Sequence, residues 1–271
     1  MHVFADGYVG VHGSSPAGGD ELVAYEALRQ QHGIERALLL GYEGEPPYRG
    51  NNAHVLALAR VRSWLTPLVY LPVASPPSAS ALREFRAGGA RGFVLFAYGA
   101  AEAEAFAEWP AATLAEMRDQ QAIVSFNADI PAIASLAPAI GELDGCPLLF
   151  SHLGEPGRFA NPPAAAEART RLAPLIALAA HDNVHVKFSG LYGMCDPQDR
   201  FPHVPARPFV EVLLDEFGPS RVLWGSDFSP ALDYVSFAET TDFELLSPSS
   251  TSEIEGIMGA NLIRLLDAQP G

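Results

Sequence analysis

A regular alternation of short apolar runs with longer amphipathic ones constrains the fold of this chain most strongly. The apolar runs are rich in β-branched or aromatic residues, which is typical of strands buried on both faces. They lie near residues 36–41, 66–71, 91–96, 122–127, 147–152, 184–189 and 221–226. Helical patterns occupy the intervals, near residues 20–32, 51–62, 78–88, 110–120, 130–143, 163–181, 205–217 and 250–267. This alternation predicts parallel strands joined by right-handed helical crossovers.

The first helical pattern lacks a full strand before it. Residues 1–4 are available for that strand, which is at most about 13 Å of extended chain. No Gly-rich GxGxxG or GxxxxGK[ST] loop follows a strand, so the marks of nucleotide-binding open sheets are missing. We therefore predict an α/β fold, a (β/α)8 TIM barrel whose first strand is shortened at the N-terminus. Because no linker or composition break divides the chain, we expect a single domain over residues 1–271.

Composition narrows the classes of function. A formal net charge of −15 argues against binding to nucleic acid. No apolar run approaches the roughly 18 residues that span a bilayer. The N-terminus has neither a basic nor an apolar stretch, which predicts no secretory signal. Cys146 and Cys195 lie far apart without CxxC spacing, so we expect no disulfide and a cytoplasmic protein.

Three of the predicted strands carry side chains that can do chemistry, namely those with Asp227, His152 and, in the shortened first strand, His2. In an α/β barrel the active site lies at the carboxyl ends of the strands. Asp227 ends the run at 221–227 and can act as a general base, a metal ligand or a simple helix or turn cap. His152 ends another run and suits proton transfer, metal binding or a structural contact. Two complementary groups at strand ends favour a catalytic pair.

Six segments, in this order, resemble the amidohydrolase-related family of TIM-barrel metal-dependent hydrolases and decarboxylases. The family includes sugar-acid and dicarboxylate lactonases, and the resemblance covers nearly the whole chain. The most specific segment is FGPSRVLWGSDFSP at 217–230. The others are HGIERALLLG at 32–41, GARGFVLF at 89–96, LLFSHLGEPGRF at 148–159, NVHVKFSGLYG at 183–193 and GANLIRLL at 259–266.

The resemblance fails at the first strand. The family carries Asp-x-His-x-His there, and MHVF matches its tail alone, with His2 at the second histidine. Either the natural protein begins upstream of Met1, or the lineage has lost part of the motif. The resemblance offers His2, His152 and Asp227 as ligands for a divalent metal such as zinc, which needs about three protein ligands. Asn127, a poor zinc ligand, stands where some metal-binding relatives have histidine. We therefore favour a weakly bound or absent metal.

The resemblance also implies substrate contacts at several residues that follow predicted strands. Arg158 suits a bidentate contact with a carboxylate, or is a solvated loop residue. His203 lies in a Pro-rich loop that can face the barrel mouth. Tyr192, Tyr48, Arg49 and Asn52 occupy positions where relatives place substrate contacts. For Lys187, inside a strand, an ion pair or a structural role is favoured over catalysis. The remaining histidines are assigned to loops, helices or core contacts; they are His12, His32, His54, His181 and His185.

We favour hydrolysis of a small carboxylate- or sugar-derived substrate, best a lactone. Asp227 would take a proton from water, while His152, with His2 or a metal, would polarise the carbonyl. One alternative is metal-dependent, non-oxidative decarboxylation of an aromatic or related acid. Another is a catalytically impaired barrel with a binding role. The expected partners are a small-molecule substrate and, from the resemblance, a second copy in a homodimer, with neither nucleic acid nor membrane.

Overall fold

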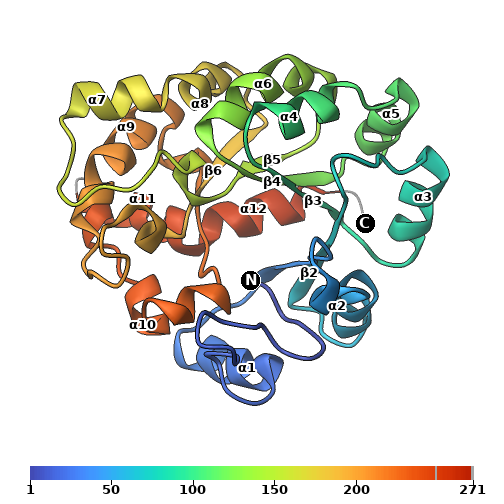
Figure 1. The fold of residues 1–271 in the computed structure, drawn as a ribbon, viewed down its shortest axis with the longest axis horizontal. Coiled ribbons are helices and arrows are strands. Elements are labelled where there is room, and N and C mark those ends of the chain that lie inside the picture. The colour runs from blue at the N-terminus through green and yellow to red at the C-terminus, as the bar shows by residue number, and fades with distance from the viewer. Residues whose placement is uncertain (248, 270–271) are drawn as a thin grey trace.

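A curled parallel sheet forms the centre of the molecule, and helices surround it (Figure 1). The structure is a computed structural model that describes residues 1–247 and 249–269. The strands pair in sequence order, each parallel to the next. They are β1 (Ala37–Leu40), β2 (Leu65–Tyr70), β3 (Gly92–Ala97), β4 (Ile123–Ala128), β5 (Leu148–Phe150), β6 (Val184–Phe188) and β7 (Val222–Trp224). The strands predicted from the seven apolar runs are confirmed.

The helices also lie where the amphipathic patterns predict them. They are α1 (Glu21–Gln31), α2 (Asn51–Arg60), α3 (Ala79–Ala87), α5 (Ala111–Asp119), α6 (Ile130–Ile140), α7 (Ala165–Arg171), α8 (Ala173–Ala177), α9 (Arg207–Phe217), α11 (Thr251–Glu255) and α12 (Asn261–Asp267). Asp20 caps the start of α1, because its carboxylate accepts the backbone N–H groups of Leu22 and Val23. Two further helices, α4 (Ala100–Ala107) and α10 (Phe237–Thr240), were not predicted.

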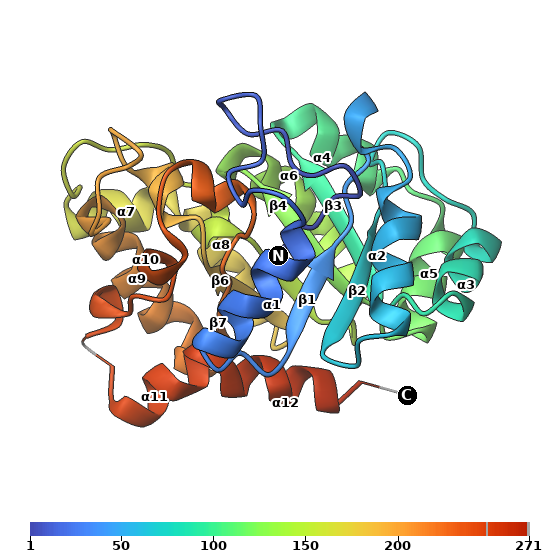
Figure 2. The same ribbon diagram turned by 90° about the horizontal axis from the view of Figure 1, so that it is seen from below.

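The core lies on both sides of the sheet. Because side chains alternate along a strand, one set faces the inside of the curl. This inner cluster consists of Leu38, Leu40, Leu68, Val94, Ile123, Leu149 and Leu223, together with Leu265 and Leu266 of α12. Helix α12 runs beneath β7 and β1 and closes the amino-terminal end of the curl (Figure 2). At the opposite, carboxyl-terminal end, the strands are followed by buried polar residues such as Ser151, Ser189 and Ser226.

The N-terminal residues lie between the two outer strands of the sheet. The ammonium group of Met1 donates to the carbonyl of Leu38 at 3.0 Å, and the N–H of Leu40 donates to the carbonyl of Met1 at 2.9 Å. One residue of a parallel strand pairs with its neighbour in this way. On the other side, the N–H of His2 donates to the carbonyl of Phe228, after β7. Met1 and His2 thus bridge the curl, although the described residues form no eighth strand.

The cysteines and the lengths of the helices can also be described. Cys146 and Cys195 are buried and free, as their spacing predicted. Among the helices of the described residues, none has the length and hydropathy of a membrane span.

Candidate active site

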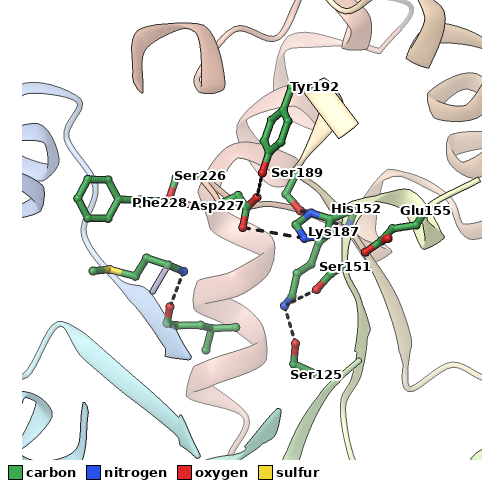
Figure 3. A network of polar contacts seen from close by, with 12 residues as sticks. Ser125, Ser151, His152, Glu155, Lys187, Ser189, Tyr192, Ser226, Asp227 and Phe228 are labelled. Carbon is green, nitrogen blue, oxygen red and sulfur yellow. Dashed lines mark hydrogen bonds and ion pairs between the residues drawn. The ribbon is translucent and has the colours of Figure 1, made fainter. Parts of the chain in front are cut away.

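His152 and Asp227 meet at the carboxyl-terminal end of the sheet, after β5 and β7 (Figure 3). The distance from Nε2 of His152 to Oδ1 of Asp227 is 3.9 Å, and the two side chains are 21% and 11% exposed. Both residues have positive φ angles, 55° and 51°. A non-glycine residue in this region costs about 1–3 kcal/mol and persists where its surroundings impose it, often at active sites. The fold therefore keeps both residues in a backbone conformation that costs free energy, and their side chains lie close together.

Tyr192 fixes the carboxylate of Asp227. Its hydroxyl donates to Oδ2 at 2.6 Å from the short helix Leu191–Met194, which follows β6. Burial, reinforced by the charge of Asp227, raises the pKa of Tyr192 well above its usual value. The hydroxyl therefore stays protonated, as a donor, at neutral pH. The ring of Tyr234 stacks on that of Tyr192 with centroids 4.9 Å apart, which holds the donor in place.

Ser189 and Gly190 orient the imidazole of His152. The hydroxyl of Ser189 accepts the backbone N–H of His152 at 3.3 Å and lies 3.1 Å from Nδ1 of its ring. A Cβ atom at Gly190 would lie 2.2 Å from the same Nδ1, so glycine is required for the ring to occupy this position. With Nδ1 engaged by Ser189, Nε2 is directed toward Asp227.

Lys187 lies in the interior of the curl below this pair. Its ammonium group donates to the hydroxyls of Ser125 at 2.6 Å and Ser151 at 3.2 Å (Figure 3). Burial lowers the pKa of Lys187 to about 8, and the charge of Asp227 opposes this shift. No carboxylate of the described residues forms an ion pair with Lys187. The sequence predicted either an ion pair or a structural role for Lys187, and its contacts with the two serine hydroxyls agree with the structural role.

An aromatic wall flanks the site, defined by Tyr42, Tyr70, Phe96 and Tyr98 at the ends of β1, β2 and β3. The ring of Tyr42 lies 4.8 Å from Phe96 and 5.4 Å from Tyr70, centroid to centroid. The hydroxyl of Tyr98 donates to Glu155 at 3.3 Å. Burial raises the pKa of Glu155. The site therefore combines an aromatic surface with carboxylates.

His2 is buried beside the wall, with its ring parallel to Phe4 at 6.0 Å. Burial lowers the pKa of His2 to about 3, so its imidazole is neutral at neutral pH, and its Nδ1 has no hydrogen-bond partner in the described structure. Within residues 1–247 and 249–269, no three His, Cys, Asp or Glu side chains form a group that could hold a metal ion. A catalytic zinc site needs about three protein ligands. The proposed set of His2, His152 and Asp227 therefore does not fit a resident metal as placed here.

Tyr48 and Asn52 are engaged in contacts within the protein. Tyr48 is buried, and its hydroxyl accepts the backbone N–H of Val9 at 3.2 Å. The side-chain amide of Asn52 donates to the carbonyl of Tyr70 at 2.9 Å and accepts its N–H at 2.7 Å. These contacts tie α2 and the N-terminal segment to the ends of the strands.

The other predicted substrate contacts lie further from the pair. Arg49 and Arg158 are exposed, and in the described structure neither forms a hydrogen bond or ion pair with His152 or Asp227. His203 is buried, and its Nε2 has no hydrogen-bond partner among the described residues. It lines a small cavity with Tyr192 and Ser189. Of the six predicted substrate residues, Tyr192 is the one that contacts the pair directly.

Sequence reasoning did not single out Ser189, Gly190, Tyr98 or Glu155. A signal was present for two of them, because Ser189 and Gly190 belong to the Lys-Phe-Ser-Gly run within NVHVKFSGLYG. For Tyr98 and Glu155 we find no comparable signal. Their proximity depends on how the loops after β3 and β5 fold toward each other.

Comparison with known proteins gives a match to a family and a partial match to a curated protein. The family model described as amidohydrolase matches residues 16–268. A curated L-fucono-1,5-lactonase of Burkholderia ambifaria is 47% identical over 51 residues, which is 19% of this chain and 17% of that protein. The match therefore spans less than a fifth of either protein.

Solved structures share the fold along nearly the whole chain. An amidohydrolase from Burkholderia multivorans with bound zinc has a TM-score of 0.74 at 22% identity, over 92% of this chain and 88% of the other. A structure from Pseudomonas putida, described as a candidate 2-pyrone-4,6-dicarboxylic acid hydrolase, has a TM-score of 0.71 at 22% identity. That match covers 98% of this chain and 95% of the other.

Proposed function

The chain belongs to the amidohydrolase family, and we propose that it hydrolyses small lactones with Asp227 as the general base. The observation that carries this proposal is the pair itself. The carboxylate of Asp227, held by Tyr192, lies 3.9 Å from the His152 imidazole. A base and a hydrogen-bond donor that converge at the same end of the sheet can each contact a different atom of one bound ester group and its attacking water.

Each step can be assigned to residues of this chain. Asp227 takes a proton from water as the oxygen attacks the lactone carbonyl carbon. The carbonyl oxygen becomes an oxyanion, and the Nε2–H of His152 stabilises it by hydrogen bonding. The ring C–O bond then breaks, and the departing alkoxide takes the proton back from Asp227. One lactone and one water thus give one hydroxy acid, and Asp227 returns to its carboxylate form.

The surroundings of the pair favour an uncharged, sugar-derived lactone. Ligand pockets use aromatic side chains as apolar walls and a few polar groups for orientation. Tyr42 and Phe96 supply such a wall, and Glu155 and Asp227 place negative charge at the rim. These carboxylates would repel a dicarboxylate substrate. The partial match to an L-fucono-1,5-lactonase points the same way.

We further propose that residues 1–271 form one domain that closes as an eight-unit barrel with a shortened first strand. Support comes from the sequential pairing of β1 to β7 and from the bridge that Met1 and His2 form between the outer strands. The decarboxylation alternative relies on a bound metal, for which the described residues provide no group of three ligands. No observation favours it over hydrolysis.

The test is hydrolysis of a panel of five- and six-membered sugar lactones by the wild type and by Asp227→Asn. Loss of the general base is expected to lower kcat by about 10²–10⁴-fold. The midpoint of thermal unfolding should change little, because Asn keeps the shape of the side chain. Asp215→Asn is the matched control, since the side chain of Asp215 is 71% exposed on α9. A fully active Asp227→Asn enzyme would rule out this mechanism.

A further inference from the structure

A left-handed turn after β5 carries His152 and one further polar side chain. Residues 152–155 have φ angles of 55°, 55°, 79° and 50°, and Gly154 is the one glycine among them. Left-handed backbone costs a residue other than glycine about 1–2 kcal/mol. Such strain is typical of positions whose side chains serve a function. The proposed mechanism uses His152 and leaves Glu155 without a role.

The geometry of this turn places His152 and Glu155 on the same side. Two backbone hydrogen bonds of 2.9 Å, each from residue i+3 to residue i, close the turn. This bonding pattern gives about three residues per turn, so side chains at i and i+3 lie one above the other. Leu153, between them, is buried. A Cβ atom at Gly154 would lie 2.8 Å from Cδ2 of Leu175, so the turn packs directly on α8.

Glu155 lies beside the pair of His152 and Asp227 and next to the aromatic wall. Figure 3 shows its carboxylate on the side that faces His152. Its Oε1 accepts the hydroxyl of Tyr98, which belongs to the wall, at 3.3 Å. Burial raises the pKa of Glu155, and the charges of His152 and Asp227 also shift it, so both groups lie within electrostatic range.

The carboxylate of Glu155 has few partners inside the protein. Among the described residues, Tyr98 is the one hydrogen-bond donor to it, and no cation forms an ion pair with it. Glu21, which is 2% exposed, provides a contrast. Its carboxylate accepts the N–H groups of Phe4 and Tyr8 and the hydroxyls of Ser15 and Ser229. Because buried charges are normally paired or hydrogen-bonded, Oε2 of Glu155 is available to a donor from a ligand.

We propose that Glu155 selects substrates that carry hydroxyl groups, with Oε2 accepting a hydrogen bond from a ring hydroxyl while Tyr98 holds Oε1. Resting on the proposed lactone hydrolysis, this role makes Glu155 the residue that recognises a sugar-derived lactone. The hydroxyls of a sugar ring point outward from its edge, so a ring packed on Tyr42 or Phe96 can direct them to the end of the wall. A site built to bond a hydroxyl discriminates against an analogue without it, because the polar group is then left unpaired.

The test compares six-membered sugar lactones with δ-valerolactone, which has the same ring without hydroxyls. Glu155→Met removes both carboxylate oxygens and keeps the length of the side chain. Glu142→Met is the matched control, since the side chain of Glu142 is 68% exposed. Tyr98→Phe removes the donor to Oε1 and tests whether Tyr98 positions Glu155.

We expect Glu155→Met to lower kcat/KM for the best sugar lactone about 10–100-fold more than for δ-valerolactone, as loss of a hydrogen bond to a charged group does. Tyr98→Phe should shift this ratio in the same direction by a smaller factor, and Glu142→Met should not shift it. Equal losses on both lactones would assign Glu155 to the support of His152 and overturn the proposal. A ratio equal to that of the wild type would also overturn it.

A binding measurement separates the role of Glu155 from the lactonase proposal. Anhydroalditols with six-membered rings keep the hydroxyls and lack the carbonyl, so they bind without reacting. Calorimetry with these compounds, and with tetrahydropyran as the ring without hydroxyls, reports recognition even if the wild type hydrolyses no lactone. Wild-type binding that Glu155→Met weakens at least tenfold would support the role of Glu155. No preference of the wild type for the hydroxylated ring, or equal affinities in both proteins, would overturn it.

Discussion

The geometry of the site depends on three residues that follow β6. Ser189 and Gly190 set the position of the His152 ring, and Tyr192 holds Asp227. None of the three is proposed to react with the substrate. Because His152 and Asp227 both lie at positive φ, small displacements of their neighbours should change the distance between them. The residues around β6 are therefore as important to the proposed reaction as the pair.

Gly190→Ala tests this dependence. Its new methyl group would overlap Nδ1 of His152, and the backbone at Gly190 has a φ of 62°, which is unfavourable for alanine. We expect lactone hydrolysis to fall at least tenfold, and the free energy of unfolding to fall by about 1–3 kcal/mol. Gly193→Ala, in the short helix that follows Gly190, is the control, because a Cβ atom at Gly193 would meet no heavy atom within 4 Å. Equal activity in both variants would show that the position of His152 does not matter.

At the scale of single residues, the sequence allowed His152 and Asp227 to be predicted as a pair at the strand ends, but not the residues that position them. His152 and Asp227 could be identified because each ends an apolar run. The contact of Ser189 with His152 requires β5 and β6 to be neighbours in a particular register, with Leu149 opposite His185. Such a register is a property of the assembled sheet, and a single sequence does not specify it.

The strands were predictable as elements because their residues are buried on both faces. Helix α4 was missed for the opposite reason. Its sequence is mostly alanine and glutamate, and Ala103 and Phe106 are the residues that it buries, so it shows no apolar stripe. A shortened first strand was expected from the few residues before α1, but residues 1–4 form no strand in the structure. A cavity of about 950 Å³ between β1 and β7 was not expected, because volume between strands has no sequence signature.

Asn52 joins helix α2 to strand β2, and this contact leads to a prediction about stability. Asn52 was expected to contact substrate, but its amide is occupied by both backbone groups of Tyr70. Asn52→Ala would leave these groups without partners, and we expect the free energy of unfolding to fall by about 2–3 kcal/mol, with KM unchanged. Urea denaturation and lactone kinetics measure the two effects, with exposed Arg60→Ala on the same helix as control. A raised KM at unchanged stability would instead indicate a direct substrate contact.

For the molecule as a whole, the buried cation Lys187 should make stability depend on pH. Its pKa is about 8 in the folded protein, against 10.5 for an ordinary lysine. Between these values the folded chain binds fewer protons than the unfolded chain, so stability rises with pH through this window. At about 1.4 kcal/mol per pKa unit, the full gain is about 3 kcal/mol.

Urea denaturation between about pH 8 and 9.5, below the usual titration of tyrosine, measures this rise. Lys187→Met is the control, because it removes the titrating group and keeps most of the apolar chain. We expect its stability to vary less over the same range. An equal rise in both proteins would assign the effect to other groups.

The most direct test of the lactonase account is a crystal structure of Asp227→Asn with an unreacted sugar lactone. The account predicts the lactone carbonyl in contact with residues 152 and 227, with its oxygen within hydrogen-bond distance of Nε2 of His152 and its ring against Tyr42 or Phe96. A water bound to the substituted side chain at position 227 should face the carbonyl carbon. A lactone bound elsewhere on the protein, with no ligand in contact with these two side chains, would contradict the account.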